Sequence, residues 1–483
     1  MINIQPIARV VGILLLIIGG LMLSATLFSL YYKSGDERPL IYGSLCCMLF
    51  GLPLWLFRFG GKTTVNKREG YLIVALGWLA MVSFGMLPFL FSGLIPSIPA
   101  ALFETVSGMT TTGATVLTDI ESVPKGLLFW RSMTQWIGGM GIIVLTVAIF
   151  PLLGMGGIEL FQAEAPGPTS DKIHPRIQDT AKRLWQIYVG LTVTLTIILS
   201  LEGMSFYDAI NHALTTMATG GFSTKNASIA FFDSALIQYT LILFMMIAGT
   251  NYTILYFALK GRFRMVWQSD EFKSYWLIVT LLAIIVTIGI YYSINTSLEK
   301  AFRDGLFQIV SIITTTGFVT ADYTSWSSGL TALFFILMFL GACAGSTSGG
   351  IKIIRHLVFI KNSYLEFKRI LHPKAIVPLK LNNRVVAPRI MTHIIIFLLL
   401  YLISFVTGSV IVAFMGLDIV SAVGAVATSL GNVGPGLGIV GPVNNFSELS
   451  EPILLFLSFL MLLGRLELYT ILVLFTPYFW KSN

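Results

Sequence analysis

Charged residues are scarce in this chain, and their scarcity excludes an ordinary soluble protein. Only 11% of the 483 residues are charged, while 55% are hydrophobic. A soluble domain carries about 25% charged residues, so most of the surface of this protein cannot face water. The mean hydropathy of +0.83 indicates a protein that resides in a membrane.

Cysteine and histidine are also rare, which argues against metal and redox chemistry. The three cysteines, Cys46, Cys47 and Cys343, all lie in apolar segments, where we expect inert core side chains. The five histidines show no metal-ligand spacing, and the sequence contains no P-loop or dinucleotide-binding fingerprint. We therefore predict that the chain is not an enzyme and that it binds no cofactor of its own.

Long apolar segments are abundant instead. Most of them approach or exceed the ~20 residues that a helix needs to cross a bilayer. The first resembles a signal peptide in length, but no small-residue cleavage site follows it, so we expect it to be retained as a helix. Ten such segments occur, at about residues 8–31, 40–56, 71–91, 127–153, 185–201, 235–258, 275–292, 330–340, 390–415 and 452–478.

The positions of the basic residues predict the orientation of the chain. When both termini are placed in the cytoplasm, most of the 31 Lys and Arg residues fall in cytoplasmic segments, as the positive-inside rule requires. The net charge of +8 then reflects topology, so we expect no nucleic-acid partner. The basic run at residues 352–389 is expected to anchor the inner face and to contact membrane lipid.

Acidic residues show the opposite bias, toward the outer face. Two interpretations remain open: an acidic vestibule that concentrates cations through its field, or acids that gather wherever bases are excluded. The outer acids include Glu104, Asp119, Glu121, Asp208, Asp304, Asp322, Asp418, Glu448 and Glu451.

Four Thr/Gly-rich turns recur at intervals of about 100 residues, the kind of internal repetition that marks repeat architectures. We name them the first turn (residues 109–114), the second turn (218–222), the third turn (314–318) and the fourth turn (431–436). Each follows an amphipathic segment that is too short to span a bilayer and has helical spacing of apolar residues. We expect half-helices that enter the membrane from outside, with Ser205, Asp208 and Asp418 near their starts favouring N-terminal capping.

Such turns would lie at membrane depth as irregular backbone, which is tolerated only beside protein or a water-filled cavity. Four of them around one axis supply carbonyl oxygens that can replace the hydration shell of a cation. Glycine permits the backbone conformations that such a turn requires. One Thr-Thr-Gly sequence could simply end an ordinary helix, but four in equivalent places favour a cation filter.

The predicted fold is therefore an all-α polytopic membrane protein with four tandem helix–pore-helix–filter–helix repeats around a pseudo-fourfold pore. We expect a two-helix extension (1–69), repeat 1 (70–153), a cytoplasmic connection (154–183), repeat 2 (184–259), repeat 3 with a glycine-rich intramembrane loop (260–370) and repeat 4 (371–483).

Three further motifs accompany the turns: QWIGGMG at residues 135–141, GSTSGG at 345–350 and GRLE at 464–467. With them, the chain resembles the membrane subunit of the Trk branch of the Trk/Ktr/HKT potassium-transporter superfamily along essentially its whole length. The resemblance implies one selectivity glycine per turn. The filter residues are then Thr111, Thr112, Gly113, Thr219, Gly220, Gly221, Thr315, Thr316, Gly317, Asn432, Val433 and Gly434.

The fourth turn departs most from the Thr-Thr-Gly pattern. Its glycine could be Gly431, but Gly434 is preferred because Asn432-Val433-Gly434-Pro435 best matches Thr-Thr-Gly-Ala. No turn contains the full Thr-Val-Gly-Tyr-Gly sequence of tetrameric potassium channels. We therefore expect weaker discrimination among potassium, rubidium and sodium.

Residues 341–350 interrupt the second helix of the third repeat. Gly341, Gly345 and Gly349 are four residues apart, so one interpretation is a small-residue packing face on an intact helix. Their place below the third turn, together with the resemblance, favours a flexible gate. Its residues are Gly341, Gly345, Ser346, Thr347, Ser348, Gly349 and Gly350.

Arg465 belongs to the same predicted gate, because a charge within an apolar segment should face a cavity or a partner. It is either an electrostatic barrier to cations or a buried cation that binds carbonyl groups of the glycine-rich loop. Both interpretations remain open.

These features predict passive, gated potassium uptake across the bacterial inner membrane, driven by ~2.3 kcal/mol per charge per 100 mV. The resemblance implies a homodimer and a cytosolic nucleotide-binding regulatory subunit of the TrkA type. The alternative is a secondary transporter coupled to protons or sodium, which also has broken helices but usually inverted repeats.

Overall fold

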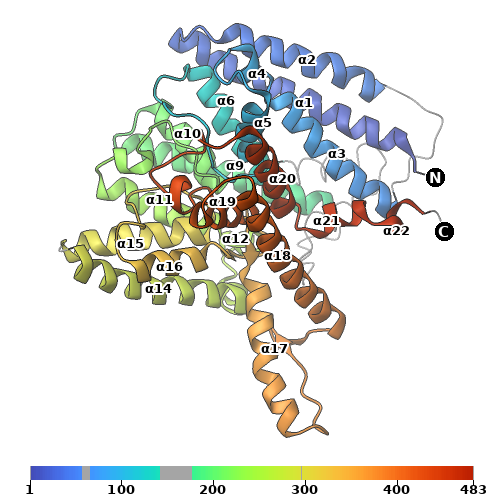
Figure 1. Cartoon of the computed structure of the whole chain (residues 1–483), viewed down its shortest axis with the longest axis vertical. Coiled ribbons are helices and arrows are strands. Elements are labelled where there is room, and N and C mark those ends of the chain that lie inside the picture. Colours follow the sequence, from blue (N-terminus) through green and yellow to red (C-terminus); the bar gives the residue numbers. More distant parts are fainter. Residues whose placement is uncertain (1, 57–65, 142–176, 295, 482–483) are drawn as a thin grey trace.

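The computed structural model describes residues 2–56, 66–141, 177–294 and 296–481, and it is predominantly helical (Figure 1). The four strands within these ranges contain two residues each, so the all-α prediction is confirmed. The elements are α1 (Ile4–Tyr32), α2 (Glu37–Leu56), α3 (Lys67–Gly85), α4 (Leu87–Phe91), α5 (Ile98–Met109), α6 (Lys125–Trp136), η1 (Ile137–Gly141), α9 (Ile177–Leu201), α10 (Phe206–Met217), η3 (Ser228–Phe231), α11 (Ala235–Ala248), α12 (Tyr252–Leu259), α13 (Phe263–Trp267), α14 (Asp270–Ile294), α15 (Leu298–Ile313), α16 (Ser328–Leu337), β1 (Leu340–Gly341), β2 (Ile351–Lys352), α17 (Ile353–Leu371), β3 (Lys380–Leu381), β4 (Arg384–Val385), α18 (Pro388–Phe414), α19 (Ile419–Gly431), η4 (Gly438–Val440), α20 (Glu451–Arg465), α21 (Tyr469–Leu472), η5 (Val473–Phe475) and α22 (Pro477–Trp480).

Within the described ranges, six helical segments are long and apolar enough to cross a membrane, and the number rises to eight if two bent helix pairs each count as one span. The chain is therefore a multi-pass membrane protein. Much of the predicted span at 127–153 and most of the predicted connection at 154–183 lie outside the described residues. The six segments are Ile4–Tyr32, Glu37–Leu56, Arg68–Phe91, Ala181–Leu201, Asp270–Ile294 and Pro388–Phe414.

Two predicted spans are broken rather than straight. Helices α11 and α12 meet at an angle of 106°, and α20 meets the segment Tyr469–Phe475 at 109°. At the second break Glu467 and Leu468 have φ values of 55° and 52°, a region that non-glycine residues rarely adopt. Hydropathy alone could not reveal these breaks, because an apolar segment reads the same whether it is continuous or bent.

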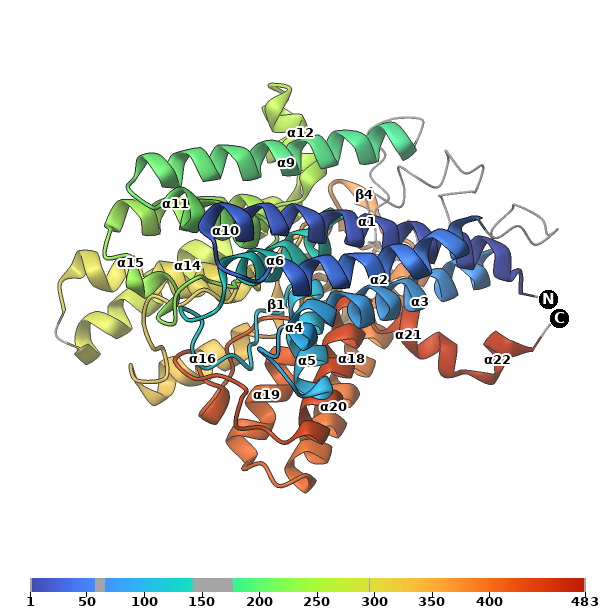
Figure 2. The ribbon, with the colours of Figure 1, turned by 90° about the horizontal axis from the view of Figure 1, so that it is seen from above.

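The N-terminal helices α1 and α2 pack side by side along one flank of the molecule (Figures 1 and 2). Small residues let their backbones approach closely, as is typical of helix pairs in membranes. A Cβ atom on Gly12 would lie 2.7 Å from the Gly51 carbonyl oxygen. The Ser44 hydroxyl also donates to the Gly19 carbonyl oxygen at 2.7 Å, which ties the two helices together.

Four short helices, α5, α10, α15 and α19, contain 12 to 16 residues. At 1.5 Å per residue they are about 18–24 Å long, which is roughly 60–80% of a hydrocarbon core of about 30 Å. Each begins with a side chain that caps a backbone N–H three residues on, as N-cap residues do. These caps are Ser97, Ser205, Ser297 and Asp418. Each helix leads directly into one of the four turns.

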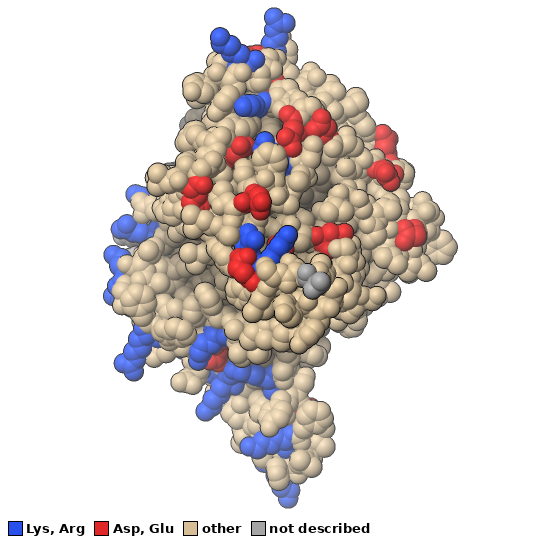
Figure 3. Space-filling model, turned by 90° about the vertical axis from the view of Figure 1, so that its left-hand side faces the viewer, with Lys and Arg blue, Asp and Glu red and all other residues tan. Residues whose placement is uncertain are grey.

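Helix α17 and the hairpin β3–β4 extend away from the rest of the molecule (Figure 1). In Figure 3, basic residues lie mainly along the left edge and on this extension at the bottom, and acidic residues lie mainly over the upper and right parts of the face in view. The two chain ends lie close together on the same side of the molecule (Figures 1 and 2). Charge is thus unevenly distributed over the surface.

Candidate functional site

The four turns share one backbone conformation. Thr111, Thr219, Thr315 and Asn432 have φ values between 53° and 55°. Two residues later in each turn stands a glycine with positive φ: Gly113 (85°), Gly221 (77°), Gly317 (79°) and Gly434 (104°). By this criterion Gly434 corresponds to Gly113. Gly431 is instead the last residue of α19.

The turns contact one another in a closed ring, which we call the ring of turns. A Cβ atom on Gly113 would overlap the carbonyl oxygen of Gly220, so the first turn meets the second. The same test brings the second turn against the third, the third against the fourth, and the fourth back against the first. The carbonyl oxygens contacted in this way belong to Gly220, Thr316, Val433 and Thr112.

A side chain is therefore excluded at each of the four glycines for two reasons. The left-handed φ disfavours a residue with a Cβ, and the neighbouring turn already occupies the space. A cavity of about 90 Å³ lies beside the ring and is lined by all four glycines. Arg131, Lys225 and Asn226 also line this cavity, so its lining includes basic and neutral polar side chains.

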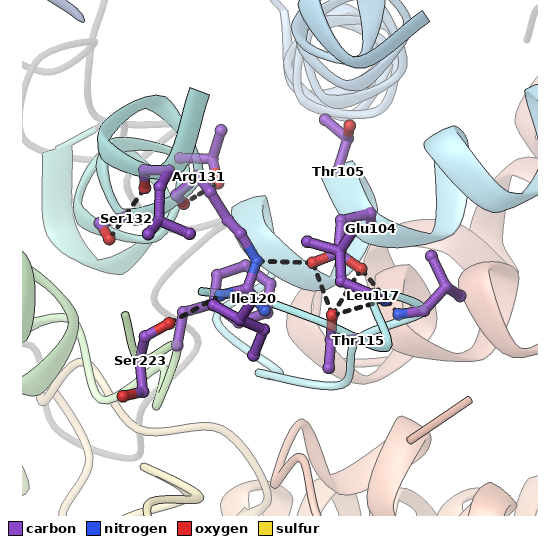
Figure 4. A network of polar contacts seen from close by, with 12 residues as sticks. Glu104, Thr105, Thr115, Leu117, Ile120, Arg131, Ser132 and Ser223 are labelled. Atoms are coloured by element: carbon purple, nitrogen blue, oxygen red, sulfur yellow. Dashed lines mark hydrogen bonds and ion pairs between the residues drawn. The ribbon is translucent and has the colours of Figure 1, made fainter. Parts of the chain in front are cut away.

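One of the residues that line this cavity, Arg131, forms a buried ion pair (Figure 4). Arg131 Nε lies 2.7 Å from Glu104 Oε1, and the two residues are 2% and 1% exposed. The Glu104 carboxylate also accepts from Val116 N at 2.8 Å and from the Thr115 hydroxyl at 3.0 Å. Because it is buried and paired, Glu104 cannot act as an open charge of an acidic vestibule.

The other end of this network reaches the chain that follows the second turn. Arg131 Nη1 donates to the Ser223 carbonyl oxygen at 3.3 Å, and the guanidinium lies 3.4 Å from the centre of the Phe222 ring. The pair therefore joins the segments that follow the first and second turns. The sequence predicted Glu104 on the outer face, but no sequence pattern indicated Arg131 as its partner.

Two kinds of side-chain bond hold the turns, hydroxyl pairs and carboxamide bonds. The hydroxyl groups of Thr110 and Thr112 lie 2.7 Å apart in the first turn, and those of Thr314 and Thr316 lie 2.8 Å apart in the third. In the fourth turn, Asn432 Nδ2 donates to Met461 O at 2.9 Å and to the Thr112 hydroxyl at 3.0 Å. The second turn is bonded by Gln135 from α6, a residue whose only signal in the sequence is its place at the start of the QWIGGMG motif.

Residues 341–350 form a loop, which we call the glycine-rich loop, and not part of a helix. Helix α16 ends at Leu337, and β1 pairs in parallel with β2 through Leu340–Ile351 and Gly341–Lys352. The interpretation of this stretch as a packing face on an intact helix is therefore wrong. The reason is that both ends of the loop pair with each other instead of continuing a helical hydrogen-bond ladder.

The glycine-rich loop lies against the ring of turns. Gly349 N donates to the Thr315 hydroxyl at 2.6 Å, and the Thr219 hydroxyl lies 3.2 Å from that of Thr347. Thr347 and Ser348 are 1% and 3% exposed. The loop thus contacts the second and third turns through the buried residues Thr347 and Gly349.

The break between α11 and α12 holds the other side of this loop. Cys343 N donates to the Gly249 carbonyl oxygen, and Tyr252 N donates to the Gly345 carbonyl oxygen, each at 3.0 Å. Ala344 N donates to Glu271 Oε1 at 2.7 Å. Backbone groups freed by the break are bonded to the loop, as buried backbone polar groups require.

Arg465 binds three carbonyl groups. Its Nη1 donates to Thr347 O at 2.8 Å, and its Nη2 donates to Gly138 O at 2.6 Å and to Gly139 O at 2.9 Å. This geometry matches the interpretation in which a partly buried cation binds the glycine-rich loop. Glu467 is paired with Arg355, so these two charges of the GRLE motif serve different partners.

The chain is similar to proteins of known family over nearly its full length. A family model named TrkH and described as a cation transport protein matches residues 39–482. The Trk system potassium uptake protein TrkH of Salmonella typhimurium strain LT2 is 42% identical over 99% of this chain and 100% of its own. TrkG of Escherichia coli strain K12, another Trk system potassium uptake protein, is 33% identical over 99% of both chains.

A solved structure shows the same fold. The crystal structure of the potassium transporter TrkH from Vibrio parahaemolyticus superposes with a TM-score of 0.89 and 38% sequence identity, covering 99% of this chain and 100% of that one. Full-length similarity in both sequence and structure, together with the family match, leads to one conclusion. This chain belongs to the TrkH family of cation transport proteins.

Proposed function

We propose that this chain takes up potassium through a gated, channel-like pore whose selective part is the ring of turns. The closed ring of four like-shaped turns is the observation that carries the proposal. Rings of backbone carbonyls can substitute for the hydration shell of an ion. The relatives named above are potassium uptake proteins. The proposed ion-binding residues are Thr111, Thr112, Gly113, Thr219, Gly220, Gly221, Thr315, Thr316, Gly317, Asn432, Val433 and Gly434.

The ring offers few layers of oxygen atoms. Each turn has one short stretch between its left-handed residue and its glycine, such as Thr111 to Gly113. We expect this short site to separate potassium from rubidium poorly. Permeability ratios as sharp as those of a tetrameric potassium channel would contradict this part of the proposal.

The glycine-rich loop is the proposed gate. It contacts Thr219 and Thr315 of the ring, and Arg465 holds its Thr347 carbonyl. A loop held by side-chain bonds from several elements can be released when those elements shift. Gly341, Gly345, Ser346, Thr347, Ser348, Gly349 and Gly350, with Arg465, form this proposed gate.

We place the protein in the bacterial inner membrane with both termini in the cytoplasm, built from four repeats after a two-helix extension. The positive-inside rule and the closeness of the two chain ends (Figure 2) support this orientation. The relatives are components of a Trk system, which supports a regulatory subunit, and we propose that it is cytosolic and of the TrkA type and that the chain forms a homodimer. Opening of the gate would then depend on that subunit.

Purified protein in liposomes tests the proposal. A channel-like pore carries a potassium current that reverses at the potassium equilibrium potential, whatever the proton and sodium gradients. Rubidium uptake with and without the regulatory subunit measures gating in the same preparation. Uptake that requires a proton or sodium gradient would replace the proposal with a cation-coupled transporter.

A further inference from the structure

We propose that Gln135 of α6 is a specificity-determining positioning residue for the ring of turns. In this inference, which rests on the proposed function, its carboxamide replaces the side chain that the second turn lacks at Gly220. It thereby holds one of the four ring carbonyls in place.

The carboxamide binds the second turn on both sides of Gly221. Gln135 Nε2 donates to the Gly220 carbonyl oxygen at 2.6 Å, and Gln135 Oε1 accepts from Phe222 N at 3.0 Å. The Gln135 side chain is fully buried. Both polar atoms of the amide are thus used, and both bonds are made to the backbone of one turn.

The second turn differs from the others at the position bonded by Gln135. The residues that correspond to Gly220 are Thr112, Thr316 and Val433, all with side chains. Thr112 and Thr316 bond to Thr110 and Thr314 within their own turns. The second turn has Ala218 and Gly220 at these two places, so it cannot form the hydroxyl pair.

Gln135 and a side chain at position 220 exclude each other. A Cβ atom on Gly220 would lie 2.5 Å from Gln135 Oε1 and 2.8 Å from Gln135 Nε2, much closer than van der Waals contact. The fourth turn, which also lacks the hydroxyl pair, is bonded by the carboxamide of Asn432. The first and third turns are therefore held by paired threonines, and the second and fourth turns are held by an amide side chain.

This arrangement makes the ring electrically uneven. The bond from Gln135 occupies one of the two lone pairs of the Gly220 oxygen. That oxygen is fixed in direction and offers less negative potential to an ion than an unbonded carbonyl does. Without Gln135, the Gly220 peptide is free to reorient, and the distance between its carbonyl oxygen and an ion in the ring is no longer fixed.

Gln135→Met tests the bonding role, because methionine keeps the length of the side chain but cannot donate to a carbonyl. We expect the potassium-to-sodium permeability ratio under bi-ionic conditions to fall about fivefold to tenfold, the change that loss of one buried hydrogen bond corresponds to. Ser132→Ala, on the same helix, is the matched control, since its hydroxyl bonds to the Leu128 carbonyl of its own helix. An unchanged ratio in Gln135→Met, with normal uptake, would overturn the inference.

A compensating pair decides the matter if Gln135→Met does not reach the membrane. Gly220→Thr alone should reduce uptake strongly because it overlaps Gln135. Adding Gln135→Ala removes the overlap, so the double variant should conduct better than Gly220→Thr alone, and a double variant that conducts no better would overturn the inference. A wild-type protein that does not prefer potassium would instead overturn the proposed function.

Discussion

At the scale of single residues, two effects favour glycine in the ring of turns: the positive φ and the closeness of the neighbouring turn. A positive φ alone makes alanine unfavourable by roughly 1–2 kcal/mol. Gly113 has in addition the Gly220 carbonyl in the place of its Cβ. The two effects can be separated, because other glycines of the chain have a positive φ and empty surroundings.

Gly113→Ala should lower potassium uptake by at least about tenfold, since an added 1.4 kcal/mol of strain already corresponds to a factor of ten. Gly93→Ala is the control: its φ is 71°, and a Cβ there would meet no atom within 4 Å. Uptake into liposomes at equal protein density measures both. Equal losses in the two variants would show that backbone strain, not the ring contact, causes the effect.

The Glu104–Arg131 pair should contribute to stability because both charges are buried. Removing one partner of a buried pair costs about 3–5 kcal/mol, so Glu104→Gln should lower the melting temperature of the detergent-solubilised protein clearly. Glu366→Gln is the matched control, since Glu366 pairs with Arg369 at an exposed site where an ion pair contributes about 0–1 kcal/mol. A melting temperature that falls no further for Glu104→Gln than for Glu366→Gln would contradict this role.

Residue types in the turns were predictable from the sequence, but their partners were not. Spacing and composition located the four turns, the family resemblance pointed to Gly113, Gly221 and Gly317, and a pattern match favoured Gly434. Gln135 lies 85 residues from Gly220, and Arg131 lies 92 residues from Ser223. No local pattern reports such contacts, because they arise only when α6 packs beside the second turn.

At the scale of elements, hydrogen bonds connect three places where helices are interrupted. The break between α11 and α12, the glycine-rich loop and the break after α20 each leave backbone groups without a helical partner. Gly249 O, Gly345 O and Thr347 O all accept bonds from the neighbouring interruption or from Arg465. The short helices before the turns were predictable from their length and capping residues. The breaks were not, because their hydrogen bonds are made between elements.

Arg465→Ala should raise basal uptake in the absence of a regulatory subunit. The substitution removes three hydrogen bonds that join α20 to the glycine-rich loop and to η1, so the loop is freer to leave the ring. Arg389→Ala, at an exposed position of α18, is the control. Unchanged uptake at normal membrane levels would remove Arg465 from the gate.

At the scale of the whole molecule, the protruding α17 has an apolar stripe that no other described element covers. Ile360, Tyr364, Phe367 and Leu371 recur at helical spacing and are 64%, 75%, 68% and 75% exposed. Such a stripe of exposed apolar residues is typical of a site of association or of lipid contact. It supports the proposed homodimer.

Replacing Ile360 and Phe367 together by glutamate should convert the proposed homodimer into a monomer, because each subunit would place like charges in an apolar contact. Light scattering of the detergent-solubilised protein measures the mass. Ile376→Glu is the control, since Ile376 is 95% exposed and lies beyond the end of α17. A dimer that survives the double substitution would place the interface elsewhere.

The membrane character of the molecule was predictable from composition, because apolar length acts on the chain as a whole. The projection of α17 away from the other helices was not predictable from the sequence. A run of basic residues has the same composition whether it lies on the lipid or projects from the protein. Figure 3 shows that basic and acidic residues are unevenly distributed over the face in view, as their positions in the sequence predicted.

Because one chain supplies all four turns, the ring need not be symmetric. A single substitution in a channel of four identical subunits changes every quadrant at once, whereas here it changes one. Gly220, Val433 and the two threonines already differ at one equivalent position. Substitutions in such a protein can therefore change the ring one turn at a time during evolution.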